Sequence, residues 1–497
     1  MENNYHTLTL PLIVEKYQED ILNKRFEMGR HIYNSLINIT QKRYKEMIRT
    51  KKYRDIKSEL KEIYQSESKV NNVRKTELYK ELDEMYKEHK LSKFDFYKDV
   101  QEMQKHFKDN IDSLTARSIV DSLWKSYEKF LFSNGKEIHY KRYSNFNTLC
   151  GKEDIRGLRC KNDNLIWNGL NIPIKRNYKN LYETQCFEHD IAFCRIVRKF
   201  IRNKTKFYIQ IVFKGNSPYK IDKDTGELRY PSINGNVGLD IGTQTIAISS
   251  KLDVRIFELA DRIQNIEDKI KILHLKLDKS RRSMNFNNYN ENGTIKKQGN
   301  KKVIWVKSNH YIKIQNELRE LHRKQKDIRI LQHNITANYI ISKGDTFYVE
   351  KMNYSALQRR SKETKISEKT GRFRSKKRFG KSIANKAPSM LLSILEYKLK
   401  CINKELIKVD TWAVRASQYN HIDDTYIKKN LSQRWDDFNG IKIQRDVYSA
   451  FLLMNVSEDL KSINREKCIN TFDNFKVLHD IEVERLMGNN NLSSIGI

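Results

Sequence analysis

The spacing of apolar residues along the first quarter of the chain predicts one strand followed by helices. Residues 6–14 alternate apolar and polar positions as an extended strand does, and a helical pattern begins near Lys16. From about Leu22 to Phe132 there is no proline, almost no glycine and a dense mixture of positive and negative charges. This stretch is therefore expected to form helices around a thin core.

After Gly135 the pattern changes to short apolar stretches separated by turn signals. The segments expected to form strands are 135–143, 146–151, 164–176 and 194–215. The last segment is a predicted hairpin with Asn203 and Lys204 near its turn. This order, a strand, then helices, then strands again, indicates a small β-domain with a helical insertion.

A second domain is expected to begin at Val237, after a linker at 231–236. VGLDIGT, TIAISS and VRIFEL follow one another closely and predict a meander of three strands. Two long helices come next, because apolar residues recur three and four apart at 263–277 and 311–335. The second helix is expected to end near Gly344, and FYVE then forms a short buried strand.

Asp240 lies in the middle of the first of these strands. A carboxylate in a core strand costs several kcal/mol unless it binds a cation or is otherwise satisfied, and Gly238 and Gly242 beside it leave space for a phosphate. An aspartate that merely ends a strand or caps a turn is the simpler interpretation. LDIGT also fits the phosphate loop of actin-like kinases and ATPases, but the further glycine-rich loops that such proteins need do not follow.

Two more carboxylates come at positions that complete a metal site. Glu350 closes the FYVE strand, where a parallel strand could return beside the first, and Asp446 opens the apolar helix RDVYSAFLLM. Each is ordinary alone, as a solvated strand end and as a helix-capping aspartate. Together with Asp240 they predict a ribonuclease-H arrangement, in which two divalent cations about 4 Å apart hydrolyse a phosphodiester.

Composition indicates a polyanionic partner. Lys and Arg exceed Asp and Glu so far that the formal net charge is +33. No apolar run is long enough to span a membrane and no signal peptide is recognisable, so a cytosolic protein is expected. The cysteines include no C-x-x-C pair, and free thiols are expected.

The order VGLDIGT, two helices, FYVEKMN, a basic segment and QRDVYSA resembles the split RuvC nuclease of transposon-encoded TnpB proteins and of compact type V-F CRISPR effectors. The resemblance covers about residues 237–457. It implies that Asp240, Glu350 and Asp446 are the catalytic carboxylates and hold two Mg²⁺ ions, which Mn²⁺ can replace. It also implies a guide RNA (a crRNA with a scaffold or tracrRNA), target double-stranded DNA, two protein copies on one guide, and a prokaryotic cytoplasm.

The resemblance implies a multidomain α+β and α/β fold. A β-barrel-like wedge domain (1–21 and 133–230) carries a helical recognition lobe (22–132), and the linker 231–236 leads to a ribonuclease-H-like RuvC domain (237–412 and 441–497). A ribbon-like insertion that binds the target nucleic acid is expected at 413–440. The family's Asp-Val-Asn after the third motif reads Asp446-Val447-Tyr448 here, so its asparagine is lost.

In these families the ribbon often binds zinc through two C-x-x-C knuckles. The matching positions here are Asn420, Asp423, Asp436 and Asn439. Amide and carboxylate oxygens are poor zinc ligands, so no zinc is expected. Hydrogen bonds are expected to hold the ribbon instead, together with packing of Trp412, Tyr419, Trp435 and Phe438.

Basic side chains near the carboxylates are candidates for contact with nucleic acid. Arg434 matches an arginine just before the second knuckle, which either stabilises charge on the reacting phosphate or binds DNA backbone. Residues 355–386 hold 12 basic and 2 acidic residues, with Phe373 and Phe379 between them. This segment is either a solvated loop or a grip on the strand that enters the site. The gripping residues expected in it are Arg359, Arg360, Arg372, Arg374, Lys376, Lys377 and Arg378.

The leading hypothesis is therefore a guide-RNA-dependent DNA endonuclease of CRISPR defence that reads a short flanking motif. A TnpB-like nuclease guided by transposon-end RNA is the main alternative. A catalytically silent RNA-binding protein and an actin-like ATPase remain less favoured, the first because the three carboxylates are intact and the second because of the charge.

Overall fold

The computed structural model describes residues 4–65, 72–132, 135, 137–222, 224–231, 233–296, 303–367, 371, 373, 376, 379–430, 433–438 and 440–488. The chain divides into two compact units, Met1–Tyr219 and Lys220–Ile497, and both mix helices with sheets. The division lies ahead of the expected linker at 231–236. Asn236, which that linker was expected to include, is instead the first residue of a strand and pairs with Thr346.

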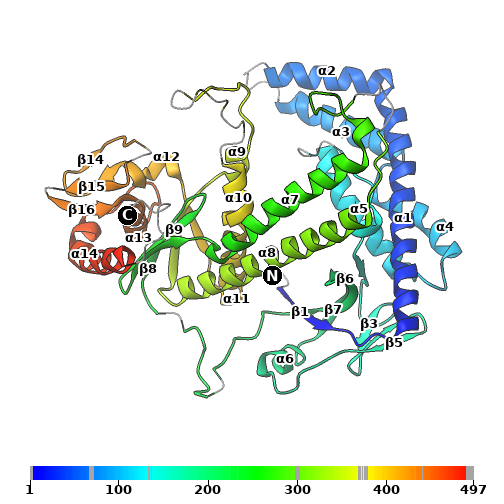
Figure 1. The fold of residues 1–497 in the computed structure, drawn as a ribbon, viewed down its shortest axis with the longest axis horizontal. Helices are drawn as coiled ribbons and strands as arrows, with labels where there is room; N and C mark the ends of the chain where they lie inside the picture. The colour runs from blue at the N-terminus through cyan, green and yellow to red at the C-terminus, as the bar shows by residue number, and fades with distance from the viewer. Residues whose placement is uncertain are drawn as a thin grey trace. The chain divides into compact units, whose positions relative to one another are not determined.

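The first unit joins a four-stranded sheet, a three-stranded sheet and a set of helices (Figure 1). Its elements are β1 (Tyr5–Pro11), α1 (Lys16–Ile48), α2 (Lys51–Gln65), α3 (Asn72–Glu88), α4 (Lys93–His106), α5 (Ser113–Phe132), β2 (Thr148–Cys150), β3 (Arg159–Lys161), β4 (Asn164–Trp167), β5 (Leu170–Pro173), α6 (Leu181–Cys186), β6 (Ile191–Ile201) and β7 (Lys204–Lys214). The predicted N-terminal strand and hairpin are confirmed, because β1 pairs with β7 and β7 with β6. Arg202 and Asn203 form the turn with positive φ angles, which a two-residue hairpin turn requires.

The strand predicted at 135–143 is wrong for the residues of it that the structure describes. Its main chain is paired with a side chain instead of with another strand. Asn34 on α1 accepts a hydrogen bond from the Lys141 amide at 2.8 Å and donates one to the Lys141 carbonyl at 2.9 Å. An asparagine that offers both a donor and an acceptor satisfies the backbone as a neighbouring strand would.

The second unit is built around a five-stranded sheet. Its elements are β8 (Asn236–Ile241), β9 (Thr245–Ser250), β10 (Val254–Glu258), α7 (Gln264–Met284), α8 (Asn309–Ile341), β11 (Thr346–Glu350), α9 (Tyr354–Leu357), α10 (Gly380–Lys386), α11 (Pro388–Cys401), β12 (Leu406–Val409), α12 (Thr411–Val414), β13 (Tyr419–Asn420), β14 (Thr425–Tyr426), β15 (Trp435–Phe438), β16 (Ile441–Gln444), α13 (Arg445–Met454) and α14 (Arg465–Met487). Figure 1 shows α7 and α8 as a long antiparallel pair. Within the described part of the chain, no helix combines the length and the apolar character needed to cross a membrane.

The strand order β10-β9-β8-β11-β12 confirms the predicted meander and the parallel return beside it. β8, β9 and β10 are antiparallel neighbours, while β11 runs parallel to both β8 and β12. Because side chains alternate across a strand, Val237, Leu239 and Ile241 face one side of the sheet, where they pack with α8 and α11. Gly238 and Asp240 face the other side, which α13 and α14 cover.

The glycine at position 238 lets α13 lie directly on the sheet. A Cβ atom added there would stand 1.9 Å from the Ala450 carbonyl oxygen and 2.5 Å from the Met454 nitrogen. The expectation that Gly238 leaves room for a phosphate is therefore wrong, because the backbone of α13 fills that room. At Gly242 the nearest atom would be the Thr245 hydroxyl oxygen at 3.4 Å, and space remains.

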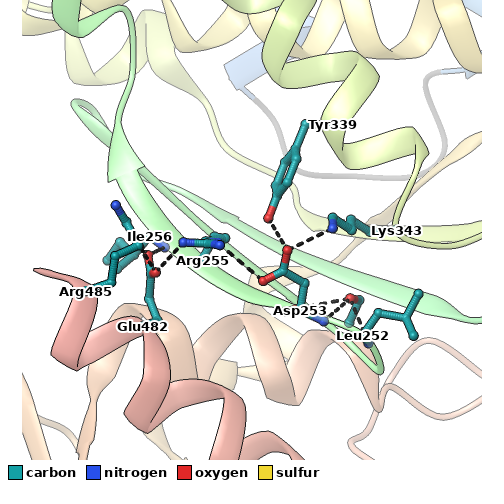
Figure 2. A network of polar contacts seen from close by, with 9 residues as sticks. Leu252, Asp253, Arg255, Ile256, Tyr339, Lys343, Glu482 and Arg485 are labelled. Carbon is teal, nitrogen blue, oxygen red and sulfur yellow. Dashed lines mark hydrogen bonds and ion pairs between the residues drawn. The ribbon is translucent and has the colours of Figure 1, made fainter. Parts of the chain in front are cut away.

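The outer edge of the sheet is closed by a network of charged residues (Figure 2). Glu482 on α14 accepts a hydrogen bond from the Ile256 amide of edge strand β10 at 2.9 Å and is paired with Arg255 and Arg485. Asp253 accepts hydrogen bonds from Tyr339 at 2.6 Å and Lys343 at 2.8 Å, which join the edge to α8 and its C-terminus. An edge amide bonded to a side chain is not available to pair with a foreign strand.

We expect Gly238→Ala to lower the free energy of unfolding by at least about 3 kcal/mol, since the added methyl group meets main-chain atoms that cannot rotate away. Gly242→Ala is the matched control and should change stability by less than about 1 kcal/mol. Urea unfolding of the full chain measures both. Equal midpoints for the two variants would contradict the close contact between β8 and α13.

Candidate active site

Asp240, Glu350 and Asp446 meet on the side of the sheet that α13 covers. β8 and β11 pair Gly238 with Tyr348 and Leu239 with Val349, so the next step of the same register sets Glu350 beside Asp240. Asp446 lies one helical turn before Ala450, the residue in contact with Gly238. Strand pairing and helix contact together therefore bring three carboxylates from three elements to one place.

The charges of the three carboxylates act on one another. Burial raises the pKa of Asp240 well above its usual range, the charges of Glu350 and Asp446 raise it further, and Arg445 opposes them. Burial also raises the pKa of Glu350 to about 6. Without a cation, the folded protein thus holds an acidic cluster that resists full ionisation.

Two arginines approach Asp446, Arg434 from just before β15 and Arg445 as the first residue of α13. Arg434 Nη1 lies 3.4 Å from Asp446 Oδ2, and Arg445 Nη2 lies 3.6 Å from Asp446 Oδ1. The Arg445 amide donates to the Arg434 carbonyl at 2.9 Å, which extends the ladder of β15 and β16 and holds the two arginines opposite each other. Arg434 was predicted from the sequence and Arg445 was not, although the place of Arg445 directly before Asp446 was a usable signal.

The donor atoms at the site suit a hard divalent cation. Carboxylate oxygens are the ligands that Mg²⁺ and Mn²⁺ prefer, and Glu350 Oε1 is buried without a hydrogen-bond partner among the described residues. Within that same part of the chain, no three His, Cys, Asp or Glu side chains are already arranged to hold one ion. The residues fit a cation, and binding it requires the carboxylate side chains to close around it.

Tyr354 connects two elements of the site, a role that was not predicted from the sequence. Its buried hydroxyl donates a hydrogen bond to the Ile241 carbonyl at 2.9 Å, so the segment after Glu350 is tied to the end of the strand that bears Asp240. Burial raises the pKa of Tyr354, and the nearby charges of Asp240 and Glu350 raise it further. The tyrosine therefore stays protonated and keeps donating.

The segment at 413–440 contains a short hairpin, and its residues after Arg434 form the first strand of a second. β13 pairs with β14, and β15 pairs with β16. Two of the four positions that match zinc ligands bind each other, since the Asn420 amide donates to Asp423 at 2.7 Å. Asp436 is buried against Lys429 at 2.6 Å, and Asn439 lies outside the described residues.

Aromatic packing attaches these hairpins to α13. Tyr419 and Phe438 are buried with the apolar side chains of α13, as expected, and Trp435 lies edge-on to His479. The expected packing of Trp412 is wrong: its side chain is 89% exposed. Trp412 precedes the hairpins, on the short helix α12, and so lies outside the apolar core.

Tyr448, at the position where the families that the sequence resembles have asparagine, contacts the hairpins instead of the carboxylates. Its hydroxyl oxygen lies 2.6 Å from His421 Nδ1 and accepts a hydrogen bond from the His421 amide at 3.2 Å. Burial, with a smaller effect from Arg465, lowers the pKa of His421 to about 4. The imidazole is therefore neutral near pH 7, and its Nδ1 can accept the tyrosine proton.

The structure describes part of the basic segment at 355–386. Arg359, Arg360 and Lys376 are exposed, as a nucleic-acid contact requires, and so are Phe373 and Phe379. Arg372, Arg374, Lys377 and Arg378 lie outside the described residues. Lys386, at the end of the segment, is buried and paired with Glu258 at 3.1 Å, so it is part of the core.

We expect Asp240→Asn to raise the melting temperature in chelator at pH 7. A raised carboxyl pKa means that the folded state holds its proton more tightly than the unfolded chain, so stability falls as pH rises through that range. Replacing the carboxyl with an amide removes this penalty. The melting temperature should rise by roughly 2–4 °C for each kcal/mol gained in the free energy of unfolding.

Asp253→Asn is the matched control in the same sheet. Burial would raise the pKa of Asp253, but hydrogen bonds from Lys343 and Tyr339 outweigh burial and lower it. Its charge is stabilising, so this variant should melt at a lower temperature. Thermal unfolding measures whether the melting temperature rises in Asp240→Asn and falls in Asp253→Asn. A lower melting temperature for Asp240→Asn would contradict the conclusion that the charge of Asp240 destabilises the fold.

Comparison with known proteins gives matches among solved structures. No family model and no curated protein matches the chain. The chain is similar to a Cas12f1–sgRNA–target DNA complex, with a TM-score of 0.45 and 11% identity over 92% of this chain and 99% of that one. It is also similar to a CRISPR-Cas12f ternary complex, with a TM-score of 0.25 and 12% identity over 88% and 82%. These neighbours are type V-F effectors, the class that the sequence resembles, at low similarity.

Proposed function

We propose that the chain is an RNA-guided DNA endonuclease with a single RuvC-type active site. The observation that carries this proposal is the cluster of Asp240, Glu350 and Asp446 on a partly parallel sheet, where burial and then the charges of Glu350 and Asp446 raise the pKa of Asp240. Three partly buried carboxylates that meet at one place, with arginines paired only to Asp446, are costly in a folded protein. A site for divalent cations accounts for that cost, and the strand order agrees with the ribonuclease-H arrangement expected from the sequence.

In this proposal the three carboxylates hold two Mg²⁺ ions, which would activate a water molecule and neutralise the attacking and leaving oxygens of a phosphodiester. Arg434 and Arg445 lie beside Asp446 and can donate hydrogen bonds to a phosphate that accumulates charge. Both donors are placed by the β15–β16 ladder before the substrate arrives. Tyr354 keeps the two strand-borne carboxylates at a constant separation.

The guide and target follow from charge and from the sequence resemblance. A net charge of +33 is suited to a large nucleic-acid partner, and base pairing with a guide RNA would supply sequence specificity. In this reading, strands of the first unit form the wedge and α1–α5 the recognition lobe. A TnpB-like nuclease guided by transposon-end RNA shares all of these features, and sequencing the RNA that copurifies with the protein separates the two.

We expect Asp240→Ala, Glu350→Ala and Asp446→Ala each to abolish cleavage of target DNA while guide and target binding stay within about twofold. Each change removes a cation ligand from a site separate from the binding surface. Asp473→Ala, an exposed carboxylate on α14, is the control and should cleave normally. Cleavage assays with Mg²⁺, Mn²⁺ or a chelator, alongside filter binding, give the comparison. Normal cleavage by any one of the three variants would remove that residue from the site.

The hairpin segment at 413–440 is proposed to be free of zinc. Elemental analysis of the purified protein should find far less than one zinc per chain, because two amides and two carboxylates bind it poorly. Cysteine at positions 420, 423, 436 and 439 together should create a zinc site near stoichiometry. Zinc in the unchanged protein, or none in the cysteine variant, would contradict the match to a ribbon that has lost its ligands.

A further inference from the structure

A buried ion pair lies inside the hairpin segment at 413–440, apart from the three carboxylates. The Lys429 ammonium lies 2.6 Å from Asp436 Oδ2, and only 11% of the lysine side chain and 3% of the aspartate side chain are exposed. The ammonium also lies 5.9 Å from the centre of the Phe438 ring and 5.7 Å from that of Tyr448. Because aromatic faces attract a cation, the carboxylate and the two rings together hold one positive charge inside the segment.

Asp436 depends on this lysine. It stands at one of the four positions that match zinc ligands, and its Oδ1 is buried without a hydrogen-bond partner among the described residues. Its charge is therefore balanced through Oδ2 and Lys429. Removal of one partner from a buried ion pair is strongly destabilising, because the other charge is left in the interior without compensation.

One end of the ion pair is next to a carbonyl that holds Arg445. Asn430 directly follows Lys429, and its carbonyl accepts hydrogen bonds from the Gln433 amide at 3.1 Å and from Arg445 Nη1 at 3.2 Å. The Arg445 guanidinium is thus anchored at the residue after the buried lysine. A fixed Lys429 therefore fixes one attachment point of Arg445.

The other end of the ion pair is two residues beyond Arg434. Asp436 is the second residue of β15, where it is opposite Ile443 of β16, and Arg434 directly precedes that strand. Arg434 Nη1 lies 3.4 Å from Asp446 Oδ2. The bond from Lys429 to Asp436 thus joins residues on either side of Arg434 and limits where its guanidinium can lie.

We propose that Lys429 is a positioning residue for phosphodiester cleavage, an inference that rests on the proposed nuclease function. Its ammonium is the internal cation of a hairpin segment that lacks good metal ligands: it neutralises Asp436 and fixes the stretch that carries Arg434 and anchors Arg445. Lys429 does not touch the reacting atoms. It acts through the two arginines, which must already be in place when charge develops on the phosphate.

Thermal unfolding of the full chain tests the ion pair without any cleavage. Lys429→Met keeps the apolar stem and removes the charge, so the melting temperature should fall by roughly 5–10 °C. Adding Asp436→Asn replaces the unpaired carboxylate by an uncharged amide of the same shape and should recover at least about half of this loss. Lys428→Met, at the exposed lysine next in the chain, is the matched control and should change the melting temperature by less than about 2 °C.

Cleavage rates separate positioning from stability. The chain is purified with the RNA that accompanies it, and a DNA complementary to that RNA is cut in Mg²⁺ with the RNA–protein complex in excess. Lys429→Met should lower the rate constant roughly ten- to a hundredfold, as a misplaced catalytic group does, and leave RNA affinity within about twofold. The double variant Lys429→Met with Asp436→Asn should recover melting temperature but not rate, because the bond beside Arg434 is still missing.

A third combination tests whether the lysine acts through the arginine. Lys429→Met added to Arg434→Ala should lower the rate little beyond Arg434→Ala alone, since residues that act as a unit are not additive. Losses that multiply would overturn the positioning role. So would an unchanged melting temperature in Lys429→Met, or a rate that recovers together with stability in the double variant, which would make Lys429 a structural residue only.

The fluorescence of Trp435, which directly follows Arg434, keeps the inference testable if the unchanged chain cuts no DNA and the proposed function fails. Acrylamide should quench Trp435 more strongly in Lys429→Met and in the double variant than in the unchanged chain, with Trp435→Phe in each background giving the signal of the other tryptophans. Equal quenching in all three proteins would show that Lys429 does not place this stretch of the chain.

Discussion

The contact between the backbone of α13 and Gly238 sets the geometry on which the candidate site depends. From Gly238 to Asp240 the strand advances about 6.6 Å, and from Ala450 back to Asp446 the helix advances about 6 Å. Both displacements point in the same direction along the sheet. The contact of α13 with Gly238 therefore places Asp446 beside Asp240. Any side chain at position 238 would lift α13 from the sheet and separate the two carboxylates.

That close approach creates an electrostatic conflict, which the surrounding residues only partly relieve. Arg434 and Arg445 both face Asp446, whereas Asp240 keeps a raised pKa because burial and two like charges outweigh Arg445. At the far end of the same strands, Asp253 has Lys343 and Tyr339 as partners and a lowered pKa. The same sheet thus holds a satisfied aspartate at one end and an unsatisfied one at the other, a contrast typical of a structural and a functional carboxylate.

Patterns of period two and period 3.6 were enough to predict the meander, the parallel return strand and the helices around them. Residue chemistry predicted that Asp240, Glu350 and Asp446 would meet, and the resemblance placed Arg434 near them; the role of these residues stays a prediction. The sequence could not reveal contacts between distant backbones, so Gly238 was assigned to a phosphate when it accommodates a helix. It also could not show that Asn34 would replace a strand as partner of Lys141, or that Trp412 would lie outside the core that Tyr419 and Phe438 join.

The absence of good zinc ligands at positions 420, 423, 436 and 439 and the exposure of Trp412 have a common physical explanation. A zinc knuckle closes a small domain on itself, whereas here the hairpins are held from one side, through His421 and Tyr448 and through aromatic packing on α13. Attachment to α13 couples the hairpins to the helix that carries Asp446, and the β15–β16 ladder holds both arginines opposite that carboxylate. The surface not needed for packing stays open, and Trp412 lies on it, on the short helix after β12. The segment therefore does not need a metal to hold it, because α13, the helix that carries Asp446, supplies its core.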